Sequence, residues 1–131
     1  MMRAALGAQS TDAEIAPLQE AARQQRLLIK RCSDCGQPHW HPRTFCPFCM
    51  SPRTLWEESK GTGVIYTFTI VRRSPTGPFA IAYIRLDSGP LMLSHVVDCR
   101  PGEIAIGKRV SVCFQPVPDA PPLPLFRLVP T

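Results

Sequence analysis

The second half of the chain is dominated by apolar residues that alternate with polar ones or run together in short blocks. In the longest segment, residues 64–71, the side chains of Val64, Tyr66, Phe68 and Ile70 share one face, and Gly61 and Gly63 precede it. This pattern predicts a long first strand with a kink or bulge near the glycines. Clusters of Pro, Gly, Ser and Asp at 74–78 and 87–90 then separate predicted strands at 79–86 and 91–97.

Beyond residue 100 the pattern predicts a short helical turn, two more strands and a proline-rich link. Ile104 and Ile106 in the turn at 101–107 are expected to plug the end of the sheet. The fourth strand is predicted at 109–115, the link at 116–122 and the last strand at 123–129. Five short strands with a bent first one predict a small closed barrel of the OB type, which leaves no free sheet edge.

The N-terminal quarter shows a weaker pattern. Residues 1–16 are small and polar, so we expect them to be mobile unless a partner holds them. The segment 17–25 (PLQEAARQQ) begins with a proline and ends in polar residues, which predicts a short helix with a weak apolar stripe. Residues 27–29 (LLI) predict a brief strand that leads into the first cysteine. We divide the chain into an N-terminal tail with a short helix at 1–26, a cysteine-containing ribbon at 27–52 and the barrel domain at 53–131.

Four cysteines form two Cys-x-x-Cys pairs, Cys32 with Cys35 and Cys46 with Cys49. Ten residues separate the pairs and include a turn-rich insert, so two short knuckles can face each other with four sulfurs at the corners of a tetrahedron. Zn²⁺ prefers this ligand set, and four thiolates leave no position open for water. The sequence therefore predicts a structural zinc ribbon without catalytic chemistry at the metal.

Three alternatives bear on these residues. Two disulfides would require an oxidising compartment, but the N-terminus has no convincing secretory leader, so we expect a reduced, cytoplasmic protein. Iron in a rubredoxin centre uses the same ligands, and metal analysis distinguishes it from zinc. His39 and His41 could replace a cysteine, but the four thiolates already complete the set, so both are interpreted as surface residues or neighbours of the ligands.

Composition narrows the function classes. The 131 residues carry 15 Lys and Arg against 10 Asp and Glu, a formal charge of +5 that favours anionic partners. The basic residues are dispersed, and no apolar stretch is long enough to span a bilayer. No catalytic triad, phosphate-binding glycine loop or carboxylate pair is visible. Cys99, Cys113 and His95 are interpreted as structural side chains, and no catalytic residue is predicted.

Several motifs in order resemble one known family. They are Cys32-Ser33-Asp34-Cys35-Gly36, Trp40-His41-Pro42-Arg43, Cys46-Pro47-Phe48-Cys49 and the strand from Gly61 to Thr69 (GTGVIYTFT), followed by Ile106-Gly107. From about residue 17 onwards the chain resembles the acyl-CoA-associated OB-fold family with a rubredoxin-like zinc ribbon, long catalogued as a domain of unknown function. The resemblance implies a mainly β fold with a short N-terminal helix, a zinc ribbon and a five-stranded OB-fold barrel.

The same resemblance implies a non-catalytic accessory subunit of a thiolase-superfamily complex, such as a thiolase, acyltransferase or aldolase. Such subunits stabilise the partner and help to bind or channel the acyl-CoA or acyl donor, so a coenzyme A thioester shared with the partner is expected. We expect Arg72, Arg73 and Phe79, beside the loop at 74–78, to contact the ligand or partner. No membrane partner is expected.

Two alternative functions remain. The first is a nucleic-acid-binding ribbon and barrel: the basic charge allows it, but the strands have few exposed aromatic residues on which bases could stack. The second is a rubredoxin-like electron carrier.

Two positions depart from the family pattern. Met50 stands where the second knuckle usually has glycine, so the backbone after Cys49 is expected to be relaxed or strained. The aromatic residues that often begin the first helix are replaced by Ala13-Glu14-Ile15-Ala16, which predicts weaker docking of this helix.

Overall fold

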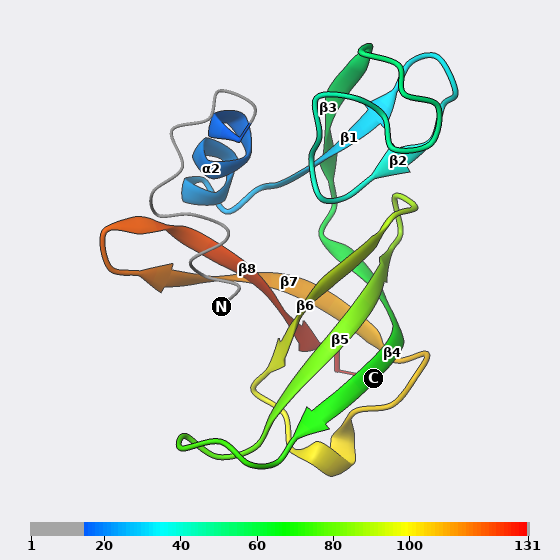
Figure 1. Cartoon of the computed structure of the whole chain (residues 1–131). Helices are drawn as coiled ribbons and strands as arrows, with labels where there is room; N and C mark the ends of the chain where they lie inside the picture. The colour runs from blue at the N-terminus through cyan, green and yellow to red at the C-terminus, as the bar shows by residue number, and fades with distance from the viewer. Residues whose placement is uncertain (1–14, 131) are drawn as a thin grey trace.

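The computed structural model describes residues 15–130. Residues 1–14, which make up most of the segment 1–16 predicted to be mobile, lie outside the described residues. The described residues form one α-helix, eight strands and a 3₁₀ turn (Figure 1). In order these are α2 (Ala16–Arg23), β1 (Leu27–Cys32), β2 (Pro38–His39), β3 (Thr54–Ser59), β4 (Thr62–Val71), β5 (Phe79–Leu86), β6 (Leu91–Val97), η1 (Pro101–Glu103), β7 (Arg109–Val117) and β8 (Ala120–Leu128).

The helix α2 is short but well terminated. Proline lies in its first turn, as predicted. At the other end Gln25 adopts a left-handed conformation (φ 60°), and the N–H of Arg26 donates to the carbonyl of Ala21 at 2.8 Å. This is the Schellman arrangement, which satisfies carbonyls at a helix end. Ala21 and Ala22 are buried, and the helix contacts both β8 and β1, so it is held by packing on both lobes.

The ribbon is a three-stranded sheet in the order β2-β1-β3. The central strand β1 is longer than predicted and pairs antiparallel with β3 from Leu27 opposite Ser59 to Cys32 opposite Thr54. The segment containing Leu55 and Trp56, which we expected to begin the barrel region, therefore lies in the ribbon sheet. The barrel strands begin at Thr62.

The remaining five strands form a closed barrel in the order β4-β5-β6-β8-β7, which confirms the predicted architecture. The first strand is bent, with an irregularity between Ile65 and Thr67. Gly63 is required nearby because a Cβ there would lie 2.4 Å from the carbonyl oxygen of Arg85 on the neighbouring strand. The barrel closes through an antiparallel pairing of β4 with β7 and a short parallel pairing of β6 with β8.

Two strand predictions match the structure and two details were wrong. The strands β5 and β6 have the predicted bounds. The proline-rich stretch is not a link, because β7 continues to Val117 and β8 begins at Ala120, with Asp119 in a left-handed turn between them. Ile104 is buried as predicted, whereas Ile106 is 67% exposed and does not plug the sheet.

A single buried cluster joins the two lobes. Its members come from both the ribbon strand β1 and the barrel: Leu27, Ile29, Ile65, Ala80, Ala82, Ile84, Leu86, Met92, Val96, Ile104, Val110 and Phe126. The two apolar side chains from β1 thus belong to the barrel's core. This shared core fixes the position of the cysteine knuckles relative to the barrel.

Candidate metal centre and neighbouring surfaces

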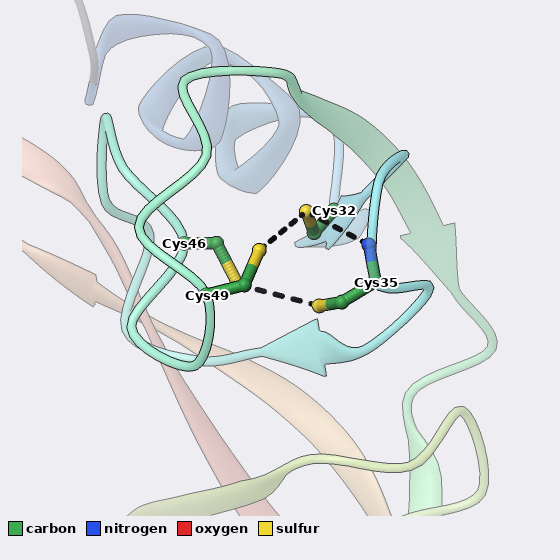
Figure 2. Close-up of side chains that lie close together, drawn as sticks. All are labelled: Cys32, Cys35, Cys46 and Cys49. Atoms are coloured by element: carbon green, nitrogen blue, oxygen red, sulfur yellow. Dashed lines mark hydrogen bonds between the residues drawn. The ribbon is translucent and has the colours of Figure 1, made fainter.

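The four predicted ligands converge on one point (Figure 2). The Sγ atoms of Cys32 and Cys49 are 3.6 Å apart, as are those of Cys35 and Cys46, and all four lie within 4.8 Å of one another. A disulfide requires about 2.05 Å between sulfurs, so these are free thiols. Within residues 15–130 no other group of His, Cys, Asp or Glu could hold a metal ion.

The two knuckles have the same construction. In the first, the backbone N–H groups of Asp34 and Cys35 point at the sulfur of Cys32, at 3.3 and 3.4 Å. In the second, the N–H of Phe48 points at the sulfur of Cys46 at 3.4 Å. Each tight turn therefore directs backbone donors at its first cysteine, and such donors stabilise a thiolate.

The spacing of the sulfurs fits a tetrahedral Zn²⁺ ion. Zn–S bonds of about 2.3 Å place the corners of a regular tetrahedron about 3.8 Å apart. The two measured contacts of 3.6 Å lie close to this edge length. Cys32, Cys35, Cys46 and Cys49 would hold the ion, and the ion would supply only structural cross-linking because all four positions are filled by sulfur.

The electrostatics of the cluster favour a bound cation. Backbone N–H groups, that of Cys35 foremost, lower the pKa of the Cys32 thiol to about 6. The Ser51 N–H favours the thiolate of Cys49, but burial and the neighbouring sulfurs outweigh it and raise the pKa of Cys49 to about 12. Four adjacent thiolates repel one another, so a divalent cation is the partner that lets all four ionise together.

A polar bridge joins the two knuckles beside the sulfurs. The hydroxyl of Ser51 donates to the carboxylate of Asp34, and Arg53 pairs with the same carboxylate at 2.7 Å. These two contacts lower the pKa of Asp34. Sequence reasoning missed the bridge, because the pairing of 34 with 51 and 53 depends on how the knuckles face each other.

The two ribbon histidines differ in environment. His41 is exposed, but His39 is only 3% exposed, and neither of its ring nitrogens makes a hydrogen bond within the described residues. His39 lies opposite Lys30 in the β1–β2 pair. Burial, together with the charges of Lys30 and Arg43, lowers the pKa of His39, so this side chain is neutral at pH 7. His39 is therefore a buried residue of the ribbon.

The other predicted site residues lie at the opposite end of the barrel, around the β4–β5 connection (Figure 1). Arg72 and Arg73 are exposed, and neither has an ion pair or side-chain hydrogen bond within residues 15–130. Phe79 is half-buried and stacks on His95, with ring centroids 5.3 Å apart and planes 11° apart. These two rings border a hollow that also includes Cys99. The structure thus groups the three predicted residues near one rim, well away from the metal centre.

Two further cysteines lie outside the metal cluster. Cys99 and Cys113 are half-buried free thiols, and burial raises the pKa of Cys99. None of the helices in the described part of the chain is long and apolar enough to cross a membrane.

Comparisons with known proteins agree with this architecture. Residues 19–54 match the family described as the ChsH2 rubredoxin-like zinc ribbon domain, and residues 56–115 match the ChsH2 C-terminal OB-fold domain. A solved structure titled Ltp2-ChsH2(DUF35) aldolase aligns with a TM-score of 0.77 and 30% identity, covering 91% of this chain and 97% of that one.

Two curated relatives carry different names. One from Methanocaldococcus jannaschii, named a DUF35 domain-containing scaffold protein, is 33% identical over 71% of this chain and 70% of its own length. Another from Thermomonospora curvata, named a probable enoyl-CoA hydratase alpha subunit, is 31% identical over 82% of this chain but only 35% of its own length. From the two domain matches and these identities, the chain belongs to the DUF35 family, with the ribbon and barrel domains of the ChsH2 type.

Proposed function

We propose that this chain is a non-catalytic accessory subunit of a thiolase-superfamily complex that acts on an acyl-CoA or related acyl donor. The observation that carries the proposal is the similarity to a chain in the structure titled Ltp2-ChsH2(DUF35) aldolase. The similarity covers 91% of this chain and 97% of that one. The scaffold name of the relative from Methanocaldococcus jannaschii supports the same role.

The site geometry is consistent with an accessory role. The one convergent cluster of ionisable groups that could bind a metal in residues 15–130 consists of four sulfurs, which would close the coordination shell of the ion. The metal would therefore hold the ribbon in one conformation on the shared core and would not activate a water or substrate. Chemistry would be performed by the partner, and the cytoplasm is the compartment in which these thiols stay reduced.

The contact with the coenzyme A part of the substrate is assigned to Arg72 and Arg73. Their charges are not neutralised by carboxylates of the described chain, unlike Arg31, which pairs with Glu57 at 2.8 Å. Phosphates of coenzyme A are the anions that such free guanidinium groups bind well. The stacked ring of Phe79 would supply an adjacent apolar wall.

Co-expression tests the accessory role. The tagged chain is produced with each thiolase-superfamily protein of the same organism, and the complexes are measured by size-exclusion chromatography and by acyl-transfer or retro-aldol assays. We expect one such protein to form a stoichiometric complex and to lose activity or solubility without this chain. Turnover by the isolated chain, or full activity of every candidate alone, would overturn the proposal.

A charge-reversal pair tests the arginine assignment inside that complex. Arg72→Glu with Arg73→Glu should raise the KM for the acyl-CoA substrate about tenfold or more, because two phosphate contacts are lost. The matched control is Lys60→Glu with Lys108→Glu, which changes the net charge equally at other exposed positions of the chain. Equal effects of the two pairs would show that only overall charge matters.

A further inference from the structure

The four cysteines of the metal centre differ in their access to solvent. Cys32 and Cys46, the first cysteine of each knuckle, are 0% exposed. Cys35 and Cys49, the second cysteine of each knuckle, are exposed. A small reactant dissolved in water can therefore reach two of the four ligands, although sulfur fills every coordination position of the ion.

The close contacts between sulfurs cross from one knuckle to the other. The Sγ atom of Cys32 lies 3.6 Å from that of Cys49, and the Sγ atom of Cys35 lies 3.6 Å from that of Cys46. Each pair thus combines an exposed cysteine with a buried one. A disulfide is about 2.05 Å long, so the two sulfurs of a pair need to approach by only about 1.5 Å to form a bond.

We propose that this cluster is an oxidation site, at which hydrogen peroxide converts the four thiolates into two disulfides between the knuckles. The bridges join Cys32 to Cys49 and Cys35 to Cys46, and zinc is released because no thiolate remains to hold it. The inference goes beyond the accessory role and requires no partner enzyme. It makes the metal content of the chain depend on oxidants as well as on the supply of zinc.

Each bridge forms in two steps that consume one molecule of peroxide. The exposed thiolate of Cys49 attacks a peroxide oxygen: an S–O bond forms, the O–O bond breaks, and hydroxide leaves. The thiolate of Cys32 then attacks the sulfur of this sulfenic acid: the S–S bond forms, the S–O bond breaks, and a second hydroxide leaves. The two sulfurs lose two electrons, which the peroxide gains. Cys35 and Cys46 react in the same way.

Pairing between the knuckles preserves the ribbon, whereas pairing within each knuckle would leave the two turns unconnected. The proposed bridges join residues 17 and 11 positions apart, while Cys32 and Cys35 are only three positions apart. A disulfide stabilises more when it closes a longer loop of the unfolded chain. The oxidised knuckles therefore stay fastened to each other, and Leu27 and Ile29 keep the ribbon on the shared core.

Peroxide titration of the zinc-loaded full chain tests the exchange. Released zinc is measured with a chromogenic chelator against a sample without peroxide, and free thiols are counted after denaturation. We expect complete oxidation to release one zinc ion and to remove four thiols per chain. Cys99 and Cys113, half-buried thiols outside the cluster, should remain reduced at the same dose. Zinc that stays bound, or earlier oxidation of Cys99 or Cys113, would overturn the inference.

Peptide mapping of the unreduced product identifies the pairing. Trypsin cuts after arginine and places one knuckle in the peptide 32–43 and the other in the peptide 44–53. Bridges between the knuckles hold these peptides together until a reductant is added, and further cleavage before Asp34 and after Phe48 separates the two bridges. Peptides that are separate without reductant, or sulfinic and sulfonic acids in place of bridges, would refute the proposed pairing.

Thermal unfolding distinguishes the exchange from simple loss of metal. One sample is oxidised with peroxide, and another is stripped of zinc by a chelator under reducing conditions, so both lack the ion. We expect the oxidised chain to unfold at the higher temperature. Its midpoint should fall to that of the stripped chain when dithiothreitol is added without zinc. Equal midpoints before reduction would show that bridges do not hold the ribbon, which contradicts the inference.

A double variant provides the matched control. Cys99→Ser with Cys113→Ser leaves only the four cysteines of the cluster. This variant should release zinc at the rate of the parent chain and give the same linked peptides. Slower release would assign the reaction to the other two thiols and overturn the inference. Complex formation with a thiolase-superfamily protein is measured separately, so the accessory role can stand when the oxidation site fails.

Discussion

Gly36 and Met50 occupy equivalent positions in the two knuckles. The N–H of Gly36 donates to the carbonyl of Cys32 at 2.9 Å, and the N–H of Met50 donates to that of Cys46 at 2.8 Å. Both residues are left-handed, with φ of 77° and 67°. Glycine adopts this conformation freely, whereas a side chain makes it costly. Of the two alternatives expected after Cys49, a relaxed or a strained backbone, the structure has the strained one at Met50.

Replacing Met50 with glycine should stabilise the protein by about 1 kcal/mol, because the left-handed penalty disappears. The side chain is 70% exposed, so little packing is lost. Urea denaturation of the zinc-loaded protein measures the change. Gly36→Ala is the reciprocal control: no atom lies within 4 Å of the added Cβ, so a similar loss would come from the backbone alone. A destabilised Met50→Gly variant would contradict this explanation.

Removing one ligand should abolish metal binding. Cys46→Ser is expected to lose zinc and to destabilise the fold by several kcal/mol, since structural zinc contributes roughly 10–16 kcal/mol of apparent binding energy in zinc-finger peptides. Mass spectrometry under native conditions and thermal melting measure the two effects. Cys113→Ser, the same chemical change at a half-buried cysteine outside the cluster, should keep one equivalent of metal. An iron-containing purified protein would refute the zinc assignment.

Acid should destabilise the ribbon through His39. The pKa of His39 is lowered in the folded chain, chiefly by burial, so the unfolded chain takes up a proton first as the pH falls below the ordinary value of 6.5. The contribution of neutral His39 to folding stability is therefore expected to be present above the ordinary pKa of 6.5 and to be lost as the pH falls below it. His39→Phe should flatten this dependence in urea denaturation. His95→Phe is the comparison. Burial also lowers the pKa of His95, but this residue lies on β6 of the barrel, so the substitution leaves the ribbon unchanged.

A second pH dependence is expected from Asp87 at lower pH. Arg109 donates to both carboxylate oxygens at 2.7 and 2.8 Å, Thr62 donates at 2.6 Å, and these contacts lower the pKa of Asp87 to about 2. Because the pKa of Asp87 in the folded chain lies below the ordinary 3.8, these contacts contribute to folding stability above about pH 4. This contribution is lost as the pH falls toward 2. The stability difference between the parent and Asp87→Asn should shrink over this range. A constant difference would show that the ion pair is not responsible.

The sequence predicted those features that local chemistry determines. The four ligands follow from cysteine spacing, and β5 and β6 were predicted to the residue because proline and glycine turns bound them. The start of β8 was missed because its prolines resemble a link, although a strand edge that donates no hydrogen bonds tolerates them. The pairing of β3 with β1 and the burial of His39 depend on tertiary contacts. No local pattern encodes them.

Leu27 and Ile29 give the two lobes a common interior. Evolution or protein engineering could not exchange this ribbon for another without also redesigning the apolar side chains that enter the barrel. A fragment cut at the ribbon's end would leave the barrel with a hydrophobic gap, and it would be prone to aggregation. The cysteine lobe and the barrel should therefore be inherited together, as a single heritable unit.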